Sequence, residues 1–184
     1  MASLAALGLV FLNMQAVLAS AAIATPRKDG FHILSDSRAA NQQVEKVSGV
    51  MPNQEASMAK LSEARFYGSL EILQGYWQCP PAPEAQEIFT IATPGRLYTP
   101  TCVQQGILNA TSYSQATLTR MLEGLNCMVW VDDMIDWGLD ETRLLDSLDL
   151  NLERLAEVGL YAAAHKCTFF ETSITWCGKC TRRG

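Results

Sequence analysis

The chain has 184 residues, of which 48% are hydrophobic and 18% are charged. This length and composition fit one domain with a sizeable core and exclude a disordered chain. With 14 basic and 19 acidic residues the net charge is -5. A molecule that is basic overall is therefore excluded, so any contact with nucleic acid must come from local basic patches.

Residues 1–24 form an apolar segment that imitates a secretory signal. An apolar run from Leu4 to Leu12 is followed by small residues, but no Lys or Arg precedes Arg27, so the positive start of a signal is missing. The polar residues after Leu12 also exclude a membrane span. We therefore expect residues 1–24 to be retained as an irregular leader of an intracellular protein, cytoplasmic or nuclear, that is neither secreted nor membrane-bound. The six cysteines are then expected to be reduced.

Cap and turn signals divide the rest of the chain into short strands and helices. Asn53 and Asp140 are suitable N-cap residues, and Gly159 is a suitable residue to end a helix. Helices are predicted over 54–64, 109–121 and 141–158; strand segments over 31–34, 65–77, 87–103 with a turn at Pro94-Gly95, and 166–180; and a loop over 79–86. Strands that alternate with helices packed on one face predict an α+β domain over residues 25–184.

Two adjacent aspartates, Asp132 and Asp133, interrupt the apolar and aromatic stretch LNCMVWVDDMIDWG, residues 125–138. Neighbouring strand residues point to opposite faces, so two such carboxylates share a side only where the chain bends. The pattern predicts a tight hairpin with both aspartates at its tip. Carboxylates held on a hairpin suit Mg²⁺, although acidic pairs are also common in ordinary surface turns.

Glu71 lies in a predicted strand that precedes this hairpin, and Gln105 and Gly106 lie in a loop between the two. Two-metal nucleotidyl transfer needs several carboxylates around a pair of ions, one of which activates the attacking oxygen and the other the leaving oxygen. A strand carboxylate beside a hairpin that carries two more meets this requirement. The order of these residues therefore favours phosphoryl or nucleotidyl transfer.

From about residue 15 to residue 178 the sequence resembles the fingers and palm of reverse transcriptases of gypsy-type LTR retrotransposons. The finger segment matches in Asp36, Arg38 and Asn41. The segments that carry the resemblance follow the family's order: FHILSDSRAANQQVEKV (31–47), GSLEILQGYWQCPPAPEAQEIFTIATPGRLYTP (68–100), VQQGILNATSYSQATLTRML (103–122), VWVDD (129–133) and LAEVGLYAAAHKCTFFETSITWCGK (155–179). The resemblance implies an antiparallel sheet with helices packed on one face, and an RNA-directed DNA polymerase, a nucleotidyltransferase.

The resemblance also implies roles for particular residues. It makes Glu71, Asp132 and Asp133 the catalytic metal ligands for two Mg²⁺ ions, with Mn²⁺ as a substitute. The nucleotide would contact Tyr76, the residue that excludes a ribose 2′-hydroxyl, together with Gln105, Gly106 and the basic finger residues Arg27 and Lys28. The implied partners are an RNA or DNA template with its primer and deoxynucleoside triphosphates.

Within the matching segments the sequence departs from the family pattern at four positions. Glu71 replaces Asp, Trp130 replaces Tyr, Gln104 replaces Pro and His32 replaces Arg. Because Glu71 adds one methylene to a metal ligand, weak activity is expected even if the fold is intact. The sequence contains no segment resembling the thumb, connection or ribonuclease H, so we expect a fragmentary or degenerate copy.

Two other interpretations stay open. The first is an inactive remnant that only binds nucleic acid. The second is a zinc-binding interaction module, because four N or S ligands lie close together in the sequence and two of them have a metal-like spacing. These four residues are His165, Cys167, Cys177 and Cys180.

Overall fold

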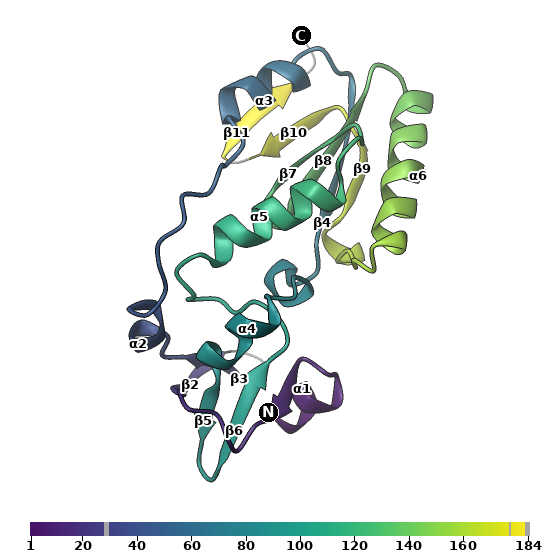
Figure 1. Cartoon of the computed structure of the whole chain (residues 1–184). Helices are drawn as coiled ribbons and strands as arrows, with labels where there is room; N and C mark the ends of the chain where they lie inside the picture. The colour runs from purple at the N-terminus through teal and green to yellow at the C-terminus, as the bar shows by residue number, and fades with distance from the viewer. Residues whose placement is uncertain (28–29, 177, 183–184) are drawn as a thin grey trace. The chain divides into compact units, whose positions relative to one another are not determined.

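The computed structural model describes residues 1–27, 30–176 and 178–182. The chain divides into two compact units (Figure 1). Unit 1 comprises Met1–Ser48 and Tyr76–Thr111, and unit 2 comprises Gly49–Gly75 and Ser112–Gly184. The sequence predicted one domain over residues 25–184, whereas the structure has a separate sheet in each unit.

Unit 1 is built on a five-stranded sheet with the order β1-β6-β5-β2-β3. Its strands β2 and β5 are parallel, and the other neighbours are antiparallel. The strands are β1 (Val10–Leu12), β2 (Ser20–Arg27), β3 (Gly30–Ser35), β5 (Ile91–Thr93) and β6 (Arg96–Pro100). The short helices are α1 (Ala2–Ala6), α2 (Arg38–Asn41), the 3-10 turns η1 (Gly75–Gln78) and η2 (Glu87–Phe89), and α4 (Pro83–Gln86).

The expectation of an irregular leader over residues 1–24 is wrong. These residues form α1, β1 and the first part of β2. The segment is ordered because β1 pairs along its length with β6, which buries Val10. The predicted loop over 79–86 is also partly helical, since Pro83 begins α4 at a position where the missing N–H of proline is tolerated.

Unit 2 contains a four-stranded antiparallel sheet with the order β7-β8-β4-β9 and a separate hairpin, β10-β11. Helix α6 packs against β8 and β4 of the larger sheet (Figure 1), and Gln115 of α5 is hydrogen-bonded to the end of β7. The strands are β4 (Phe66–Glu71), β7 (Cys127–Trp130), β8 (Asp133–Gly138), β9 (Thr168–Glu171), β10 (Ser173–Trp176) and β11 (Lys179–Arg182). The helices are α3 (Gln54–Leu61), α5 (Ala110–Met121), α6 (Glu141–Glu157) and the 3-10 turn η3 (Ala164–Lys166).

Helices α3 and α6 begin at the predicted caps. Asn53 accepts hydrogen bonds from two backbone N–H groups of α3, and Asp140 accepts one from Arg143 N at 2.9 Å. Gly159 has a φ of 73° just beyond α6, as a helix-ending glycine requires. Helix α3 ends at Leu61, three residues earlier than predicted.

Close packing joins α6 to the sheet. Leu144, Leu148 and Leu155 of α6 are buried. A Cβ atom added to Gly68 of β4 would lie 3.2 Å from Leu148 Cδ2, so a larger residue here would require the Leu148 side chain to shift by a few tenths of an ångström. Leu61, Tyr67, Ile135, Ile174 and Trp176 form a second buried cluster. In the described residues no helix is long and apolar enough to span a bilayer.

Candidate active site

The aspartate pair lies on the β7-β8 hairpin of unit 2. Trp130 pairs with Asp133, so the two-residue turn consists of Val131 and Asp132. The predicted hairpin is therefore present, but its tip is one residue earlier than predicted, and Asp133 is the first residue of β8. Val131 has a φ of 58°, which is unfavourable for a β-branched side chain and costs about 1–3 kcal/mol.

Glu71 ends β4 directly opposite Asp133 on β8. Residues directly opposite in an antiparallel pair project from the same face of the sheet, so these two carboxylates are neighbours. The backbone N–H of Ile72 donates to the carbonyl oxygen of Asp132 at 2.7 Å, which joins the turn to the end of β4. Unit 2 therefore brings Glu71, Asp132 and Asp133 together where β4 ends and β8 begins.

These acidic residues perturb one another. Asp133 is exposed as a residue, yet packing around its carboxyl group raises its pKa, and the charges of Asp132 and Glu71 raise it further. Lys166 acts in the opposite direction on the pKa of Asp133. The Lys166 ammonium donates a hydrogen bond to the Glu71 carboxylate, and this bond raises the pKa of Lys166. Lys166 is thus a counter-ion for the acidic cluster.

A metal-binding arrangement is not assembled in the part of the chain that the structure describes. No three or more His, Cys, Asp and Glu side chains are gathered there so that they could hold an ion. The carboxylate of Glu71 accepts a hydrogen bond from Lys166 instead. The donor chemistry is nevertheless suitable, since all three acidic side chains offer oxygen atoms and their mutual repulsion raises the pKa of Asp133.

Gln115 of α5 is hydrogen-bonded to the backbone of the hairpin at two places. Its Nε2 donates to the carbonyl oxygen of Val129 at 3.0 Å, and its Oε1 accepts from the N–H of Val131 at 2.8 Å. The side chain is buried, so water does not compete for these bonds. One amide therefore fixes both the end of β7 and the residue with positive φ.

The predicted nucleotide-binding loop belongs to unit 1. Gly106 has a φ of 95°, and an added Cβ would approach only Ser37 Oγ, at 3.9 Å. Glycine is therefore required here by the backbone conformation rather than by crowding. Asn41 Nδ2 donates to the Gly106 carbonyl oxygen at 2.8 Å, and Asn41 Oδ1 accepts from Leu108 N at 2.9 Å. This asparagine fixes the loop on both sides of Ile107.

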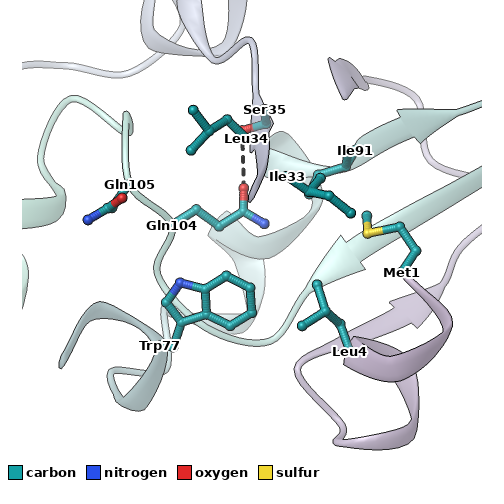
Figure 2. Close-up of a pocket in the computed structure, with 9 residues that line it drawn as sticks. All are labelled: Met1, Leu4, Ile33, Leu34, Ser35, Trp77, Ile91, Gln104 and Gln105. Carbon is teal, nitrogen blue, oxygen red and sulfur yellow. Dashed lines mark hydrogen bonds between the residues drawn. The ribbon is translucent and has the colours of Figure 1, made fainter. Parts of the chain in front are cut away.

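Gln104 lines a pocket within the same unit (Figure 2). Its side chain is buried, and its Oε1 accepts a hydrogen bond from Ser35 Oγ at 3.1 Å. Met1, Leu4, Ile33, Leu34, Trp77, Ile91 and Gln105 also line this pocket. The residue that stands in place of the family's Pro thus ties the loop to β3.

Tyr76 lies in η1, and its hydroxyl is 3.0 Å from Thr111 Oγ1. The backbone of Arg27 ends β2 opposite Gly30, whereas Lys28 lies outside the described residues. Tyr76, Gln105 and Gly106 therefore belong to unit 1, and the three acidic residues belong to unit 2.

The zinc interpretation finds no support in the described residues. Cys167 is half-buried, and its Sγ donates to the carbonyl oxygen of Ala163 at 3.3 Å. Together with His165 and Cys180 it belongs to no described group that could hold a metal. Cys177 lies outside the described residues.

The sequence prediction assigned no role to Gln115 or Lys166, and it gave Asn41 only a match. A signal for Gln115 was available, because it shares the apolar face of its helix with Leu118 and Leu122, where a polar side chain needs a buried partner. Lys166 carried no such signal, since its partner Glu71 is 95 residues away in the sequence.

A family model for reverse transcriptase (RNA-dependent DNA polymerase) matches residues 26–179. The chain belongs to this family. A Pro-Pol polyprotein of feline foamy virus is 23% identical over 171 residues, which are 92% of this chain. The Pol polyprotein of the Drosophila melanogaster transposon gypsy is 27% identical over 149 residues, or 79% of this chain. The predicted resemblance to gypsy-type elements is confirmed.

The fold matches solved reverse transcriptase structures. A foamy viral protease-reverse transcriptase in complex with double-stranded DNA has a TM-score of 0.84 at 20% identity and covers 98% of this chain. A foamy viral protease-reverse transcriptase in complex with an RNA/DNA hybrid also has a TM-score of 0.84 at 20% identity over 98% of this chain. The predicted fold of reverse-transcriptase fingers and palm is confirmed. The chain spans 15% and 14% of the two polyproteins, and 32% and 24% of the two solved chains.

Proposed function

We propose that this reverse transcriptase domain is an RNA-directed DNA polymerase that joins a deoxynucleotide to the 3′-hydroxyl of a primer on an RNA or DNA template. One observation carries the proposal: Glu71 and Asp133 face each other on adjacent strands, with Asp132 in the turn beside them, in a chain of this family. The nucleic acids in the solved structures of foamy viral relatives support this class of partner.

Asp132 and Asp133 would hold Mg²⁺ together with the phosphates of the incoming nucleotide, as Mg²⁺ usually takes one or two carboxylates plus substrate phosphates. Glu71 would complete a site for a second ion after it releases Lys166. Bound ions would activate the attacking hydroxyl and stabilise the leaving oxygen. Mn²⁺ shares the oxygen preference of Mg²⁺ and is proposed as a substitute.

The residues of unit 1 would bind the nucleotide itself. Asn41 holds Gly106 in a conformation that leaves its backbone uncovered by a side chain, which suits close approach by a ligand. We assign Gln105 to the same loop surface, and Tyr76 to the exclusion of a ribose 2′-hydroxyl. Arg27 and Lys28 would supply charge-assisted hydrogen bonds to the triphosphate.

One observation favours the alternative of an inactive domain that only binds nucleic acid. Lys166 already neutralises Glu71, which is itself a replacement for the family's Asp. A chain with this contact would bind a template-primer through unit 1 but would not bind two catalytic metal ions in unit 2.

Primer extension on a poly-rA template with an oligo-dT primer separates these functions. We expect extension with dTTP that requires Mg²⁺ or Mn²⁺, and its loss in Asp132→Asn. The matched control is Asp149→Asn, which removes one exposed charge from α6 of the same unit. If the wild type binds the template-primer but extends it with neither metal, the polymerase proposal is wrong and the binding alternative stands.

A further inference from the structure

Asp136 is a buried acid that the proposed reaction does not use. It lies in the middle of β8 and is fully buried, with Gly68 of β4 and Cys127 of β7 as its register partners. From α6 it is contacted by Ser147 and Asn151. The Cys127 thiol is neutral, because burial raises its pKa to about 12. The side chains that face Asp136 from β7 and α6 are thus uncharged, and Gly68 of β4 offers none.

The hydrogen bonds of this site are incomplete in a particular way. Ser147 Oγ donates to Asp136 Oδ1 at 3.1 Å, and Asn151 Nδ2 donates to the same oxygen. Within the described residues, Asp136 Oδ2 and Asn151 Oδ1 are buried and have no hydrogen-bond partner. Both are acceptors if the acid is ionised, so neither can satisfy the other. A buried carboxylate with an unpaired oxygen is strongly disfavoured.

A single proton resolves both unpaired atoms. We propose that at acidic pH Asp136 is protonated in the folded protein and forms a cyclic acid–amide pair with Asn151. In this pair Asn151 Nδ2–H donates to Asp136 Oδ1, and the acid proton on Oδ2 donates to Asn151 Oδ1. The pair links the centre of β8 to α6, on the sheet face opposite Asp133. Its proton makes the attachment of α6 sensitive to pH.

The acidity of the group agrees with this geometry. Burial raises the pKa of Asp136 to about 7, even though the hydrogen bonds from Ser147 and Asn151 lower it. An acid whose folded pKa lies above its unfolded value stabilises the fold fully below the unfolded pKa, near 4, and loses this contribution as the pH rises through 7. The contribution of Asp136 to the folding equilibrium constant should fall about tenfold for each pH unit in that window.

The test is the pH dependence of urea unfolding for the full chain, compared among wild type, Asp136→Asn and Asp149→Asn. An asparagine at 136 reproduces the protonated pair, because its amide both donates to Asn151 Oδ1 and accepts from Nδ2. We expect the folding constant of Asp136→Asn, divided by that of wild type, to rise about a hundredfold between pH 5 and pH 8. Asp149 is exposed on the same helix, so Asp149→Asn should follow the wild type. A ratio for Asp136→Asn that stays constant over this range would overturn the proposal.

A second measurement on the wild type covers the case in which Asp136→Asn fails to fold. The 13C shift of the Asp136 carboxyl carbon reports its protonation directly by NMR. We expect a protonated carboxyl at pH 5 and a titration midpoint near 7. An ionised carboxylate at pH 5 would overturn the acid–amide pair whatever the variant does. Neither measurement depends on polymerase activity, so a failure of the proposed function leaves this test intact.

Discussion

Strand β8 carries two aspartates in contrasting surroundings, Asp133 at its exposed end and Asp136 at its buried centre. Asp133 lies among other charges, with Glu71 opposite, Asp132 beside it and Lys166 as the counter-ion. Asp136 lies among uncharged side chains from β7 and α6 and is held by Ser147 and Asn151. Both acids have raised pKa values, because both lose solvation.

The two aspartates differ in what compensates the negative charge of the carboxylate. Around Asp133 the neighbouring carboxylates favour a cation, and the Lys166 ammonium partly supplies this positive charge. Among the described residues no cation contributes to the pKa shift of Asp136, so a proton is the remaining means of neutralising the acid. A raised pKa alone therefore does not identify a catalytic acid, and its neighbours decide between a site for ions and a structural proton. Substitutions on either side of β8 test this contrast.

The hairpin that carries Asp133 should depend strongly on Gln115. Gln115→Leu leaves the carbonyl oxygen of Val129 and the N–H of Val131 without partners, which should lower the free energy of unfolding by roughly 2 to 3 kcal/mol. Urea unfolding at constant pH measures this change. Thr119→Ala is the control, since it removes only the hydrogen bond from Gln115 Nε2 to exposed Thr119. Equal stability of Gln115→Leu and Thr119→Ala would show that Gln115 does not support the hairpin.

Shortening Glu71 tests whether the carboxylates at the Asp133 end of β8 bind metal. An aspartate at 71 moves the carboxylate back toward β4 and away from Lys166, so it becomes available to a metal. In a chain extended by a related thumb, Glu71→Asp should raise Mg²⁺-dependent primer extension at least tenfold, about 1.4 kcal/mol of barrier. The control is Glu55→Asp, an exposed residue in α3. If Glu71→Asp changes nothing while the wild type extends primers well, Glu71 is not a metal ligand.

Sequence patterns predicted the surroundings of Asp133 better than those of buried Asp136. The aspartate hairpin, the caps at Asn53 and Asp140, and the helix-ending Gly159 are local signals, and the structure confirms all four. The strand pairing that places Glu71 opposite Asp133 is not local, and the order of family motifs was needed to anticipate it.

Other features could not be predicted because their partners are distant in the chain. The pairing of β1 with β6 joins residues about 90 positions apart, so the N-terminal segment read alone resembled a leader. The sequence places Asp136 in an apolar run, and nothing in that run indicates that Asn151 contacts it. The contact between Lys166 and Glu71 depends on the turn η3 reaching the end of β4.

Ser147 tests the buried side of the comparison. Ser147→Ala removes the hydroxyl that donates to Asp136 Oδ1 and to the Asn126 carbonyl oxygen, and should lower the free energy of unfolding by about 1 kcal/mol. Because the bond to Asp136 Oδ1 lowers the pKa of Asp136, its loss should raise that pKa above the wild-type value. Unfolding curves and 13C NMR measure the two effects. Ser62→Ala, which loses an exposed bond to the Ala59 carbonyl oxygen, should leave the Asp136 pKa unchanged.

The smallest expected effect concerns Lys166, and it separates the two acids most directly. Lys166→Met removes the cation that lowers the pKa of Asp133, so that pKa should rise further above its usual value. The sign follows because the charges of Asp132 and Glu71, which favour the protonated form of Asp133, are then unopposed. Asp136 lies on the other face of the sheet, and Lys166 is not among the groups that shift its pKa.

Titration of both carboxyl carbons by 13C NMR in one sample provides the measurement. We expect the Asp133 midpoint to move to higher pH in Lys166→Met while the Asp136 midpoint stays in place. Lys60→Met is the control, because Lys60 is exposed on α3 and does not contribute to the pKa shift of Asp133. Since Lys166 is itself exposed, its pair with Glu71 adds little stability, and the unfolding midpoint should hardly change. Equal shifts at both aspartates would mean that one shared field acts on β8, and the contrast between a site for ions and a structural proton would then fail.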